Sequence, residues 1–267
     1  MTQVYVGGMG VCDYPFIIGA VNVATAEKLM AINRQFYQTL ALPFSATRHR
    51  LQPGVRRILE EIPERVNILD LGCGNGELAH ELARRGHIGV YIGLDFSPEL
   101  LSEARKPPLE PLQAHFISAD LSSLDWPLAI QNLQPLSFNF QPDRVLAFAV
   151  LHHLPGVILR RQVLRQVKAI LSPTGRFIHS EWQFMNSERF RQRIQPWESV
   201  GIGSDEVDAG DTLLDWRSGG YGLRYVHLFS EEELAQLAEE SDFTVKESFY
   251  SDGQGGRLSL YQDWQPV

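Results

Sequence analysis

Three alternating glycines follow directly after an apolar stretch at residues 68–76, and this feature limits most strongly how the chain can fold. The segment reads Ile-Leu-Asp-Leu-Gly-Cys-Gly-Asn-Gly, and Leu-Asp-Phe-Ser follows at 94–97. Glycine permits a tight turn and a close approach to a ligand because it has no Cβ. An acid at this distance, Asp95, lies where the tips of adjacent strands meet in a parallel βαβ unit. The pattern predicts a site for a nucleoside-containing molecule, with Asp95 accepting hydrogen bonds from the ribose hydroxyls.

The rest of the chain alternates strands with helices, which is typical of a parallel sheet covered on both faces. Strands are expected at 66–71, 89–95, 114–118, 143–149 and 176–182, and helices at 26–41, 53–62, 76–86, 98–106 and 157–171. Thr25, Pro53 and Ser97 with Pro98 are the expected helix starts. Ser230 and Glu233 form a capping box for a helix at 231–240, followed by strands at 243–250 and 257–263 around a glycine-rich hairpin turn. The segment 183–229 shows no clean periodicity.

The composition is that of an ordinary globular protein and excludes several classes. The chain has 267 residues, of which 44% are hydrophobic and 21% charged, enough for one large α/β domain with additions. Residues 1–27 contain no Lys or Arg, so a secretory signal is not expected, and no apolar run approaches the roughly 18 residues of a membrane span. Cys12 and Cys73 form neither a disulfide framework nor a zinc pattern. These features predict a cytoplasmic protein.

The kind of nucleoside depends on the glycine spacing and on a second acid. A dinucleotide site favours Gly-x-Gly-x-x-Gly, but here the third glycine comes one position early and Glu77 follows it. A glycine turn with no ligand is the simplest alternative, and it would make the acids at Asp70 and Asp95 coincidental. Asp120, followed by Leu121, also comes after an expected strand. Three strands that end at or near an acid therefore favour a ligand with several polar groups.

Asp-x-Gly-x-Gly-x-Gly with acids after the second and third strands resembles class I S-adenosylmethionine-dependent methyltransferases. The resemblance implies a Rossmann-like, seven-stranded α/β sheet, mostly parallel with a C-terminal antiparallel hairpin. It also implies that Asp70 lies near the ammonium group of the cofactor S-adenosyl-L-methionine, Asp95 at the ribose and Asp120 at the adenine amino group. Cys73 is expected to be a small packing residue in the turn rather than a nucleophile. The residues predicted to bind the cofactor are Tyr37, Asp70, Gly72, Cys73, Gly74, Gly76, Asp95, Phe96, Asp120, Leu121, Ala147 and Phe148.

Stretches outside the glycine motif resemble tRNA wobble-uridine carboxymethyl methyltransferases, discontinuously over residues 30–263. These stretches are Tyr37 with Phe44-Ser45-Ala46-Thr47-Arg48, 149–153 with Arg160-Arg161, 211–216, and 224–229 before 232–234. The glycine motif is shared by many methyltransferases, whereas Arg-Tyr-x-His-Leu-Phe at 224–229 is far more selective. Pro43 stands where the family usually has histidine, and a glycine-rich turn at 253–256 replaces an expected Asn-Trp pair.

The reaction implied by this resemblance is methylation of the carboxylate of a 5-carboxymethyluridine at the wobble position. A carboxylate, with a pKa of about 4, is already a nucleophile at neutral pH, and arginine pairs with both of its oxygens. Arg48 and Arg224 are the candidates for this clamp, although either can instead bind the cofactor carboxylate. His152 and His153 are expected at the mouth of the site, where each either acts on the substrate or caps loop backbone. Trp216 either stacks on a base or packs the insertion. Arg48, His152, Trp216 and Arg224 are thus the predicted catalytic residues; Asp211 and His227 are carried only by the resemblance.

Two enzyme hypotheses and one binding hypothesis remain open. The first is a tRNA methyltransferase, for which a small zinc-binding activator subunit is an implied partner. The second is a small-molecule O- or C-methyltransferase with 183–229 as a lid, and the third is a cofactor-binding protein without catalysis. The net charge of −8 argues mildly against a nucleic-acid-coated protein, but Arg161, Arg165 and Lys168, with 48–50 and 189–193, can form a local basic face. We expect a single domain with parts 1–55, 56–182, 183–229 and 230–267.

Overall fold

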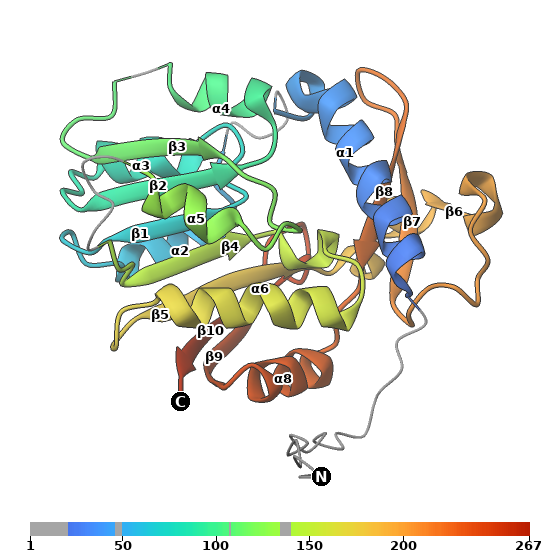
Figure 1. Cartoon of the computed structure of the whole chain (residues 1–267). Helices are drawn as coiled ribbons and strands as arrows, with labels where there is room; N and C mark the ends of the chain where they lie inside the picture. Colours follow the sequence, from blue (N-terminus) through green and yellow to red (C-terminus); the bar gives the residue numbers. More distant parts are fainter. Residues whose placement is uncertain (1–20, 46–49, 107, 134–139) are drawn as a thin grey trace, which may run out of the picture.

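The computed structural model describes residues 21–45, 50–106, 108–133 and 140–267. Its main sheet has the strand order β3-β2-β1-β4-β5-β10-β9 (Figure 1). The first five of these strands are parallel, whereas β10 is antiparallel to both β5 and β9. The strands are β1 Ile68–Leu71, β2 Val90–Asp95, β3 Gln113–Ser118, β4 Arg144–Phe148, β5 Arg176–Trp182, β9 Phe243–Ser251 and β10 Ser259–Pro266. This is the predicted α/β fold with its terminal antiparallel hairpin.

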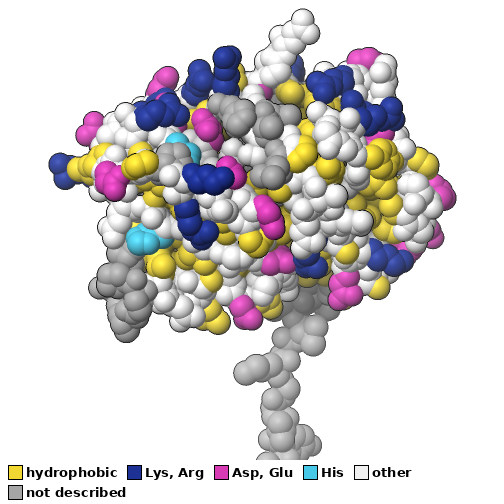
Figure 2. Space-filling model, turned by 90° about the horizontal axis from the view of Figure 1, so that it is seen from above, with side chains coloured by type: hydrophobic (Ala, Val, Ile, Leu, Met, Phe, Trp, Pro, Cys, Tyr) yellow, Lys and Arg dark blue, Asp and Glu magenta, His cyan; other side chains and the backbone are white. Residues whose placement is uncertain are grey.

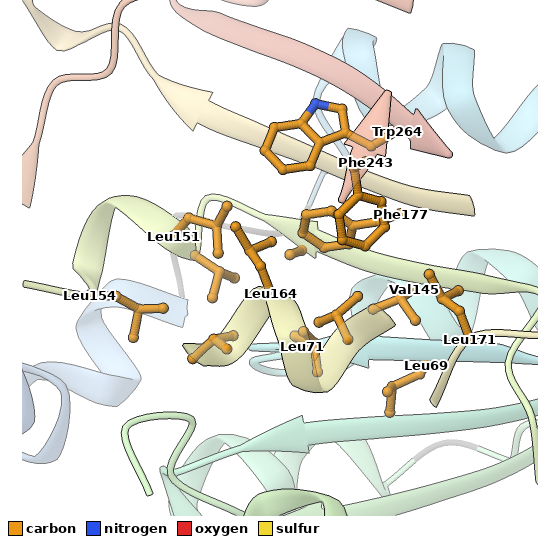
Figure 3. Close-up of a cluster of buried hydrophobic side chains, with 14 of the residues drawn as sticks. Leu69, Leu71, Val145, Leu151, Leu154, Leu164, Leu171, Phe177, Phe243 and Trp264 are labelled. Atoms are coloured by element: carbon orange, nitrogen blue, oxygen red, sulfur yellow. The ribbon is translucent and has the colours of Figure 1, made fainter. Parts of the chain in front are cut away.

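Helices cover both faces of this sheet because alternate side chains of its strands point to opposite sides. On one face Leu69 and Leu71 of β1 pack in one apolar cluster with α5 (Trp126–Gln131), α6 (Val157–Ile170) and α8 (Glu231–Glu240), around Phe177, Phe243 and Trp264 (Figure 3). On the other face Ile68 packs with α2 (Pro53–Glu61) and α3 (Glu77–Arg84). The core therefore lies in two layers, one on each side of the sheet.

Local start signals explain most helix boundaries. The Ser97 hydroxyl accepts a hydrogen bond from the Leu100 amide at the start of α4 (Pro98–Ala104), and the Ser230 hydroxyl accepts one from Glu233 at the start of α8. The first helix differs from expectation, since α1 spans Val23–Ser45. Asn22 caps it by accepting a hydrogen bond from the Thr25 amide at 2.9 Å, and the Thr25 hydroxyl instead donates to Glu206. The prediction that Thr25 is the cap is therefore wrong.

The segment 183–229 forms a second, smaller sheet. Its antiparallel order is β6-β7-β8, with β6 Ile194–Gln195, β7 Asp211–Trp216 and β8 Gly222–His227. Short helical turns precede and separate these strands at η2 Phe184–Asn186, α7 Glu188–Arg191 and η3 Trp197–Val200. The sequence shows no clean periodicity in this segment and did not predict these strands. Both faces of the sheet are covered: Tyr225 packs with Leu29 on one side, and Val226 packs with Phe184 on the other.

Helix α1 lies between the two sheets (Figure 1). The Asn33 side-chain amide bonds to both backbone groups of Tyr225 in β8. Its oxygen accepts from the Tyr225 amide at 2.8 Å, and its nitrogen donates to the Tyr225 carbonyl at 3.1 Å. One helical turn further, Tyr37 lies against Phe96, which follows β2, with ring centroids 5.7 Å apart. The same helix therefore touches the tips of the large sheet and the small sheet.

Two smaller elements complete the fold. The short helix α5 lies between β3 and β4, and η1 Leu151–His153 follows β4. None of the helices in the described ranges combines the length and apolar character needed to cross a membrane.

Candidate active site

The glycine turn after β1 adopts a backbone conformation that other residues rarely accept. Gly72, Gly74 and Gly76 have φ angles of +70°, +55° and +75°. A Cβ on Gly72 would lie 2.7 Å from a methyl carbon of Val150, whereas a Cβ on Gly74 would meet no atom of the described residues within 4 Å. Gly72 is therefore closely packed, whereas Gly74 is not packed against any of the described residues. Such a turn leaves backbone groups accessible to a ligand.

Alanine at Gly72 is expected to lower the free energy of unfolding by about 2–4 kcal/mol, through the positive φ and the contact with Val150. Gly86 is the matched control, because its φ is +78° but its Cβ would meet no described atom within 4 Å. Gly86→Ala should cost only about 1–2 kcal/mol. Urea unfolding of both variants measures the difference. Equal losses would contradict the tight packing at Gly72.

Cys73 lies inside this turn as a packing residue. The side chain is 8% exposed, and a Cβ added to Gly93 would lie 2.8 Å from its sulfur. Burial raises the pKa of the Cys73 thiol well above its usual value, and the nearby carboxylates of Asp70 and Asp95 add to this rise. A thiol kept protonated in this way is a poor nucleophile, in agreement with the interpretation as a small packing residue.

Asp95 ties the glycine turn to the end of β2. One carboxylate oxygen accepts a hydrogen bond from the Gly74 amide at 2.9 Å, and the other accepts from the Ser97 amide at 2.8 Å. Burial raises the pKa of Asp95, while these amide hydrogen bonds act in the opposite direction. Sequence reasoning proposed Asp95 only as a ribose acceptor. The structure adds a second role, because the same carboxylate shapes the turn.

Asp70 lies beside Asp95 on the same face of the sheet, next to a residue that sequence reasoning missed. Its carboxylate accepts a hydrogen bond from the Tyr91 hydroxyl at 2.5 Å, and both side chains are buried. Burial, with a smaller contribution from the charge of Asp95, raises the pKa of Asp70 to about 7, while Tyr91 lowers it. The signal for Tyr91 was its position four residues before Asp95, which places both side chains on one face of β2.

Asp120 lies two residues beyond β3 and pairs with α1. Arg34 donates to one of its oxygens at 2.9 Å, and the other oxygen accepts from the Ser122 amide and hydroxyl. Hydrogen bonds from Ser122 and Arg34 keep the pKa of Asp120 below its usual value despite partial burial. Leu121 packs against the core layer that contains α5 and α6. Sequence reasoning missed Arg34, because nothing near it in the sequence indicates this partner.

The guanidinium group of Arg224 lies among three aromatic rings. Its central carbon is 5.0 Å from the centroid of the Trp182 ring, 5.1 Å from that of Phe36 and 5.5 Å from that of Trp216. Cations at such distances are attracted by the faces of aromatic rings. Arg224 is only 4% exposed. The structure thus brings together two predicted residues, Arg224 and Trp216, and adds Trp182 and Phe36.

Further aromatic rings extend from Arg224 to the end of β2. Phe36 contacts Tyr37 with centroids 5.0 Å apart, and Tyr37 contacts Phe96, beside Asp95, at 5.7 Å. We call Phe36, Tyr37, Phe96, Trp182 and Trp216 the aromatic wall. Three of these residues were predicted site residues. The predicted Arg48 lies outside the described residues.

Histidines 152 and 153 lie beside the aromatic wall. His153 Nδ1 is 3.1 Å from the Tyr225 carbonyl, and its Nε2 is 3.0 Å from the Tyr37 hydroxyl. This geometry assigns the proton to Nδ1, with Nε2 accepting from Tyr37. His153 therefore caps backbone, as one of the two sequence interpretations expected.

His152 is buried rather than placed at an open mouth. It is 1% exposed, and its Nδ1 lies 3.0 Å from a carboxylate oxygen of Glu181. The other oxygen of Glu181 is 2.9 Å from Nδ1 of His179. Desolvation raises the pKa of Glu181 and lowers the pKa of His179 to about 3. The expected position of His152 at the mouth is wrong, and its role in the reaction stays a prediction.

Ala147 and Phe148 lie at the carboxyl end of β4. Ala147 is fully buried in the core layer that contains α6, and Phe148 packs on the opposite face, 6.0 Å from the Tyr261 ring. Because alternate residues point to opposite faces, the two side chains cannot face one ligand together on the same side of the sheet. Their contact with the cofactor stays a prediction.

Asp211 and His227 lie in a buried polar network that joins the small sheet to α6 and α8. One Asp211 oxygen accepts from the Tyr225 hydroxyl at 2.8 Å and is 2.6 Å from His227 Nδ1. Arg160, 1% exposed, donates to the Tyr225 hydroxyl at 3.1 Å, and His227 Nε2 lies 2.9 Å from Glu233. Tyr225 and His227, which belong to the selective stretch at 224–229, therefore make hydrogen bonds that connect the small sheet to α6 and α8.

Phenylalanine at Tyr225 is expected to lower the free energy of unfolding by about 1–3 kcal/mol, because it removes a buried hydroxyl that both donates and accepts. Tyr221, which is 64% exposed, provides the control. Tyr221→Phe should change stability by less than about 0.5 kcal/mol. Guanidinium unfolding of the two variants, compared with the wild type, checks this; a neutral Tyr225→Phe would exclude an important structural role for the network.

The predicted basic side chains are largely paired with acids of the chain itself. Arg161 pairs with Glu240, Lys168 pairs with Asp242 at 3.2 Å, and Arg193 pairs with Asp215 at 3.2 Å. Figure 2 shows Lys and Arg in separate groups with Asp and Glu among them. On the face drawn there, the described residues form no continuous basic surface.

The chain belongs to the methyltransferase domain family, whose model matches residues 44–248. The fold agrees: a SAM-dependent methyltransferase from Methanosarcina mazei superposes with a TM-score of 0.58 at 23% identity, covering 81% of this chain and 98% of that one. S-adenosylmethionine is the cofactor of this class of enzyme. The predictions of a methyltransferase, of its fold and of its cofactor are confirmed.

Curated relatives differ in what their names state. A protein from Encephalitozoon cuniculi with a methyltransferase name is 28% identical, over 79% of this chain and 86% of its own. A tRNA (carboxymethyluridine(34)-5-O)-methyltransferase from Schizosaccharomyces pombe is 27% identical over 81% and 90%. A 2-phytyl-1,4-naphtoquinone methyltransferase from Thermosynechococcus vestitus is 31% identical over 51% and 57%. The chain spans only 31% and 23% of the tRNA methyltransferases from Arabidopsis thaliana and Mus musculus.

Proposed function

We propose that this enzyme transfers the methyl group of S-adenosylmethionine to the carboxylate of a 5-carboxymethyl-type uridine at the tRNA wobble position, in the cytoplasm. The observation that carries this proposal is the buried Arg224 among the aromatic rings of Trp182, Phe36 and Trp216. A guanidinium group binds both oxygens of a carboxylate. Aromatic rings beside it can stack on the base that carries that carboxylate.

The cofactor would be held at the carboxyl ends of β1 and β2. Asp70 would face the ammonium group, the turn from Gly72 to Gly76 the methionine part, and Asp95 with Phe96 the ribose and adenine. Among the described residues, no atom lies within 4 Å of a Cβ built on Gly74, which agrees with a ligand lying against this turn. Asp120 would accept from the adenine amino group with the part of its carboxylate that Arg34 and Ser122 leave accessible. When bound, S-adenosylmethionine supplies a methyl group that is already activated by its sulfonium charge.

A carboxylate acceptor matches the side chains available in this site. Since the acceptor is ionised at neutral pH, with a pKa of about 4, no base has to remove a proton before methyl transfer. The residues of the aromatic wall would exclude water and orient the acceptor, and orientation alone can contribute several kcal/mol. Trp216 stacks on the base in this proposal, and Arg48 is a second cation for the acceptor or for the cofactor carboxylate. His152, held by Glu181, would support the wall from behind.

A relative that aligns with most of the chain supports a tRNA substrate, whereas other observations favour a small-molecule acceptor. The S. pombe tRNA methyltransferase aligns with 81% of this chain. The quinone methyltransferase relative, the net charge of −8 and the internal ion pairs of Arg161 and Lys168 favour a small-molecule acceptor. In that second candidate function, 183–229 would serve as a lid over an O- or C-nucleophile.

An assay of methyl transfer to tRNA distinguishes the tRNA methyltransferase function from the small-molecule function. Total tRNA is first treated with mild alkali, which hydrolyses existing methyl esters and exposes carboxymethyl groups. The enzyme is then incubated with labelled S-adenosylmethionine, with and without a small zinc-binding activator subunit, which we propose as a partner. We expect label in a base-labile ester nucleoside after digestion. A parallel reaction contains 2-phytyl-1,4-naphthoquinone in place of tRNA. Label in the quinone and none in tRNA would favour the small-molecule function.

A further inference from the structure

Tyr91 and Asp70 form a buried pair directly below the glycine turn. The parallel register of β1 and β2 places Ile68 opposite Tyr91 and Asp70 opposite Gly93. Since side chains alternate along a strand, Asp70, Tyr91 and Asp95 all point to the same face of the sheet. The Tyr91 hydroxyl reaches one oxygen of Asp70 at 2.5 Å, and Tyr91 is fully buried.

Tyr91 has no alternative role in the cofactor contacts described above. Its ring packs in the layer formed with α2 and α3 and lies 5.9 Å from the Phe116 ring. Only its hydroxyl reaches toward the turn. Burial raises the pKa of the Tyr91 phenol well above its usual value, so the hydroxyl keeps its proton and donates to Asp70.

We propose that Tyr91 is a positioning residue for the methyl donor: its hydroxyl orients the Asp70 carboxylate and keeps it ionised toward the donor's ammonium group, which makes donor affinity depend on pH near neutrality. This inference rests on the proposed placement of the donor at Asp70 and is independent of the methyl acceptor.

The charged and titratable neighbours determine the direction of the effect. Burial and the carboxylate of Asp95 favour the neutral form of Asp70, and the Tyr91 hydroxyl favours the ionised form. The Cys73 thiol, in the turn above, is kept protonated by burial, while Arg105 acts on it in the opposite direction. Asp70 therefore has a pKa of about 7. A cationic ligand group binds the ionised form, so affinity should decrease as the pH falls below about 7.

Loss of the Tyr91 hydroxyl removes the hydrogen bond that favours ionised Asp70. In Tyr91→Phe, the pKa of Asp70 should rise, and the pH at which affinity begins to decrease should rise with it. For a midpoint one unit higher, affinity at pH 7 would fall about fivefold. At pH 8.5 the variant and the wild type should differ much less.

Calorimetry with two ligands tests this effect between pH 6 and 8.5. S-adenosylhomocysteine carries the ammonium group, whereas 5′-methylthioadenosine has the same nucleoside but no amino-acid part. We expect a higher midpoint for S-adenosylhomocysteine in Tyr91→Phe and unchanged binding of 5′-methylthioadenosine. Asp70→Asn should bind S-adenosylhomocysteine with no midpoint in this range. Thermal melting checks that the variants are folded. If Tyr91→Phe does not fold, the pH midpoint of S-adenosylhomocysteine binding is compared between the wild type and Asp70→Asn.

The outcomes separate this inference from the proposed function. If both ligands bind but the midpoint is the same in wild type and Tyr91→Phe, or in wild type and Asp70→Asn, the inference is wrong and the donor site stands. An equal loss of both ligands would assign Tyr91 a merely structural role and also overturn it. If neither ligand binds the wild type, the donor placement is wrong and the inference falls with it.

Discussion

Alanine at Asp95 should weaken the binding of S-adenosylhomocysteine by about a hundredfold or more, the largest effect on donor binding that we expect. Two losses combine. The carboxylate would no longer accept from the ribose hydroxyls, and charge-assisted hydrogen bonds are roughly twice as strong as neutral ones. The Gly74 and Ser97 amides would also lose the acceptor that now holds the turn in shape. Titration calorimetry measures the change.

Asp125→Ala is the control for this substitution. Asp125 is exposed and lies at the start of α5, where its side chain makes no capping hydrogen bond. Its replacement should leave the affinity within about twofold of wild type, since surface substitutions usually change free energies by less than about 0.5 kcal/mol. Unchanged affinity in Asp95→Ala would show that the donor does not lie at the end of β2.

Methionine at Arg224 is expected to reduce methyl transfer by about a thousandfold while S-adenosylhomocysteine binds within twofold of wild type. Methionine occupies similar space among Phe36, Trp182 and Trp216 but offers no charge to a carboxylate. Losing one partner of a buried charged pair costs about 2–5 kcal/mol, and each 1.4 kcal/mol corresponds to about tenfold. Arg224→Lys should recover only part of the rate, because an ammonium group lacks the planar fork.

The rate of transfer to alkali-treated tRNA is the readout for Arg224. Arg65, which is exposed and lies outside the basic positions 48–50, 161–168 and 189–193, provides the control, and Arg65→Ala should retain most of the activity. A loss of donor affinity in Arg224→Met that equals the loss of rate would place this guanidinium at the cofactor instead. Wild-type rates with tRNA would exclude Arg224 as the carboxylate clamp.

The glycine turn, the end of β2 and two helix starts were predictable because their signals are local. The glycines at 72, 74 and 76 require positive φ angles, and Asp95 follows at the distance that adjacent parallel strands impose. Ser97 and Ser230 cap helices within three residues of their own position. Each of these features depends on neighbours in sequence, so pattern and spacing were sufficient to predict them.

The small sheet was not predictable for a physical reason. Residues Arg224 to His227 are all buried, and two of these four, Arg224 and His227, have basic side chains. Alternation of polar and apolar residues appears only where one face of a strand meets water. Both faces of β8 are covered here, by the aromatic wall, by the core residues around Tyr225 and by the buried network with Arg160. Because polar residues occupy buried positions, the sequence shows no alternation of polar and apolar residues.

The remaining site residues depend on contacts between distant parts of the chain. Arg34 reaches Asp120 across 86 positions, and Asn33 reaches Tyr225 across 192. No spacing rule connects such pairs. Trp182 and Phe36 became recognisable only when the fold placed them around Arg224, although Trp182 carried a weak signal as the last residue of the fifth strand.

The position of α1 has a consequence for how the two substrates bind. Within two turns, Arg34 and Tyr37 contact Asp120 and Phe96, beside the proposed donor site. Asn33 and Phe36 contact β8 and Arg224, at the proposed acceptor site. A ligand that orders α1 on binding causes part of the loss of conformational entropy that the second ligand would otherwise cause. The two substrates should therefore bind with positive cooperativity, and by linkage each should increase the affinity of the other by the same factor.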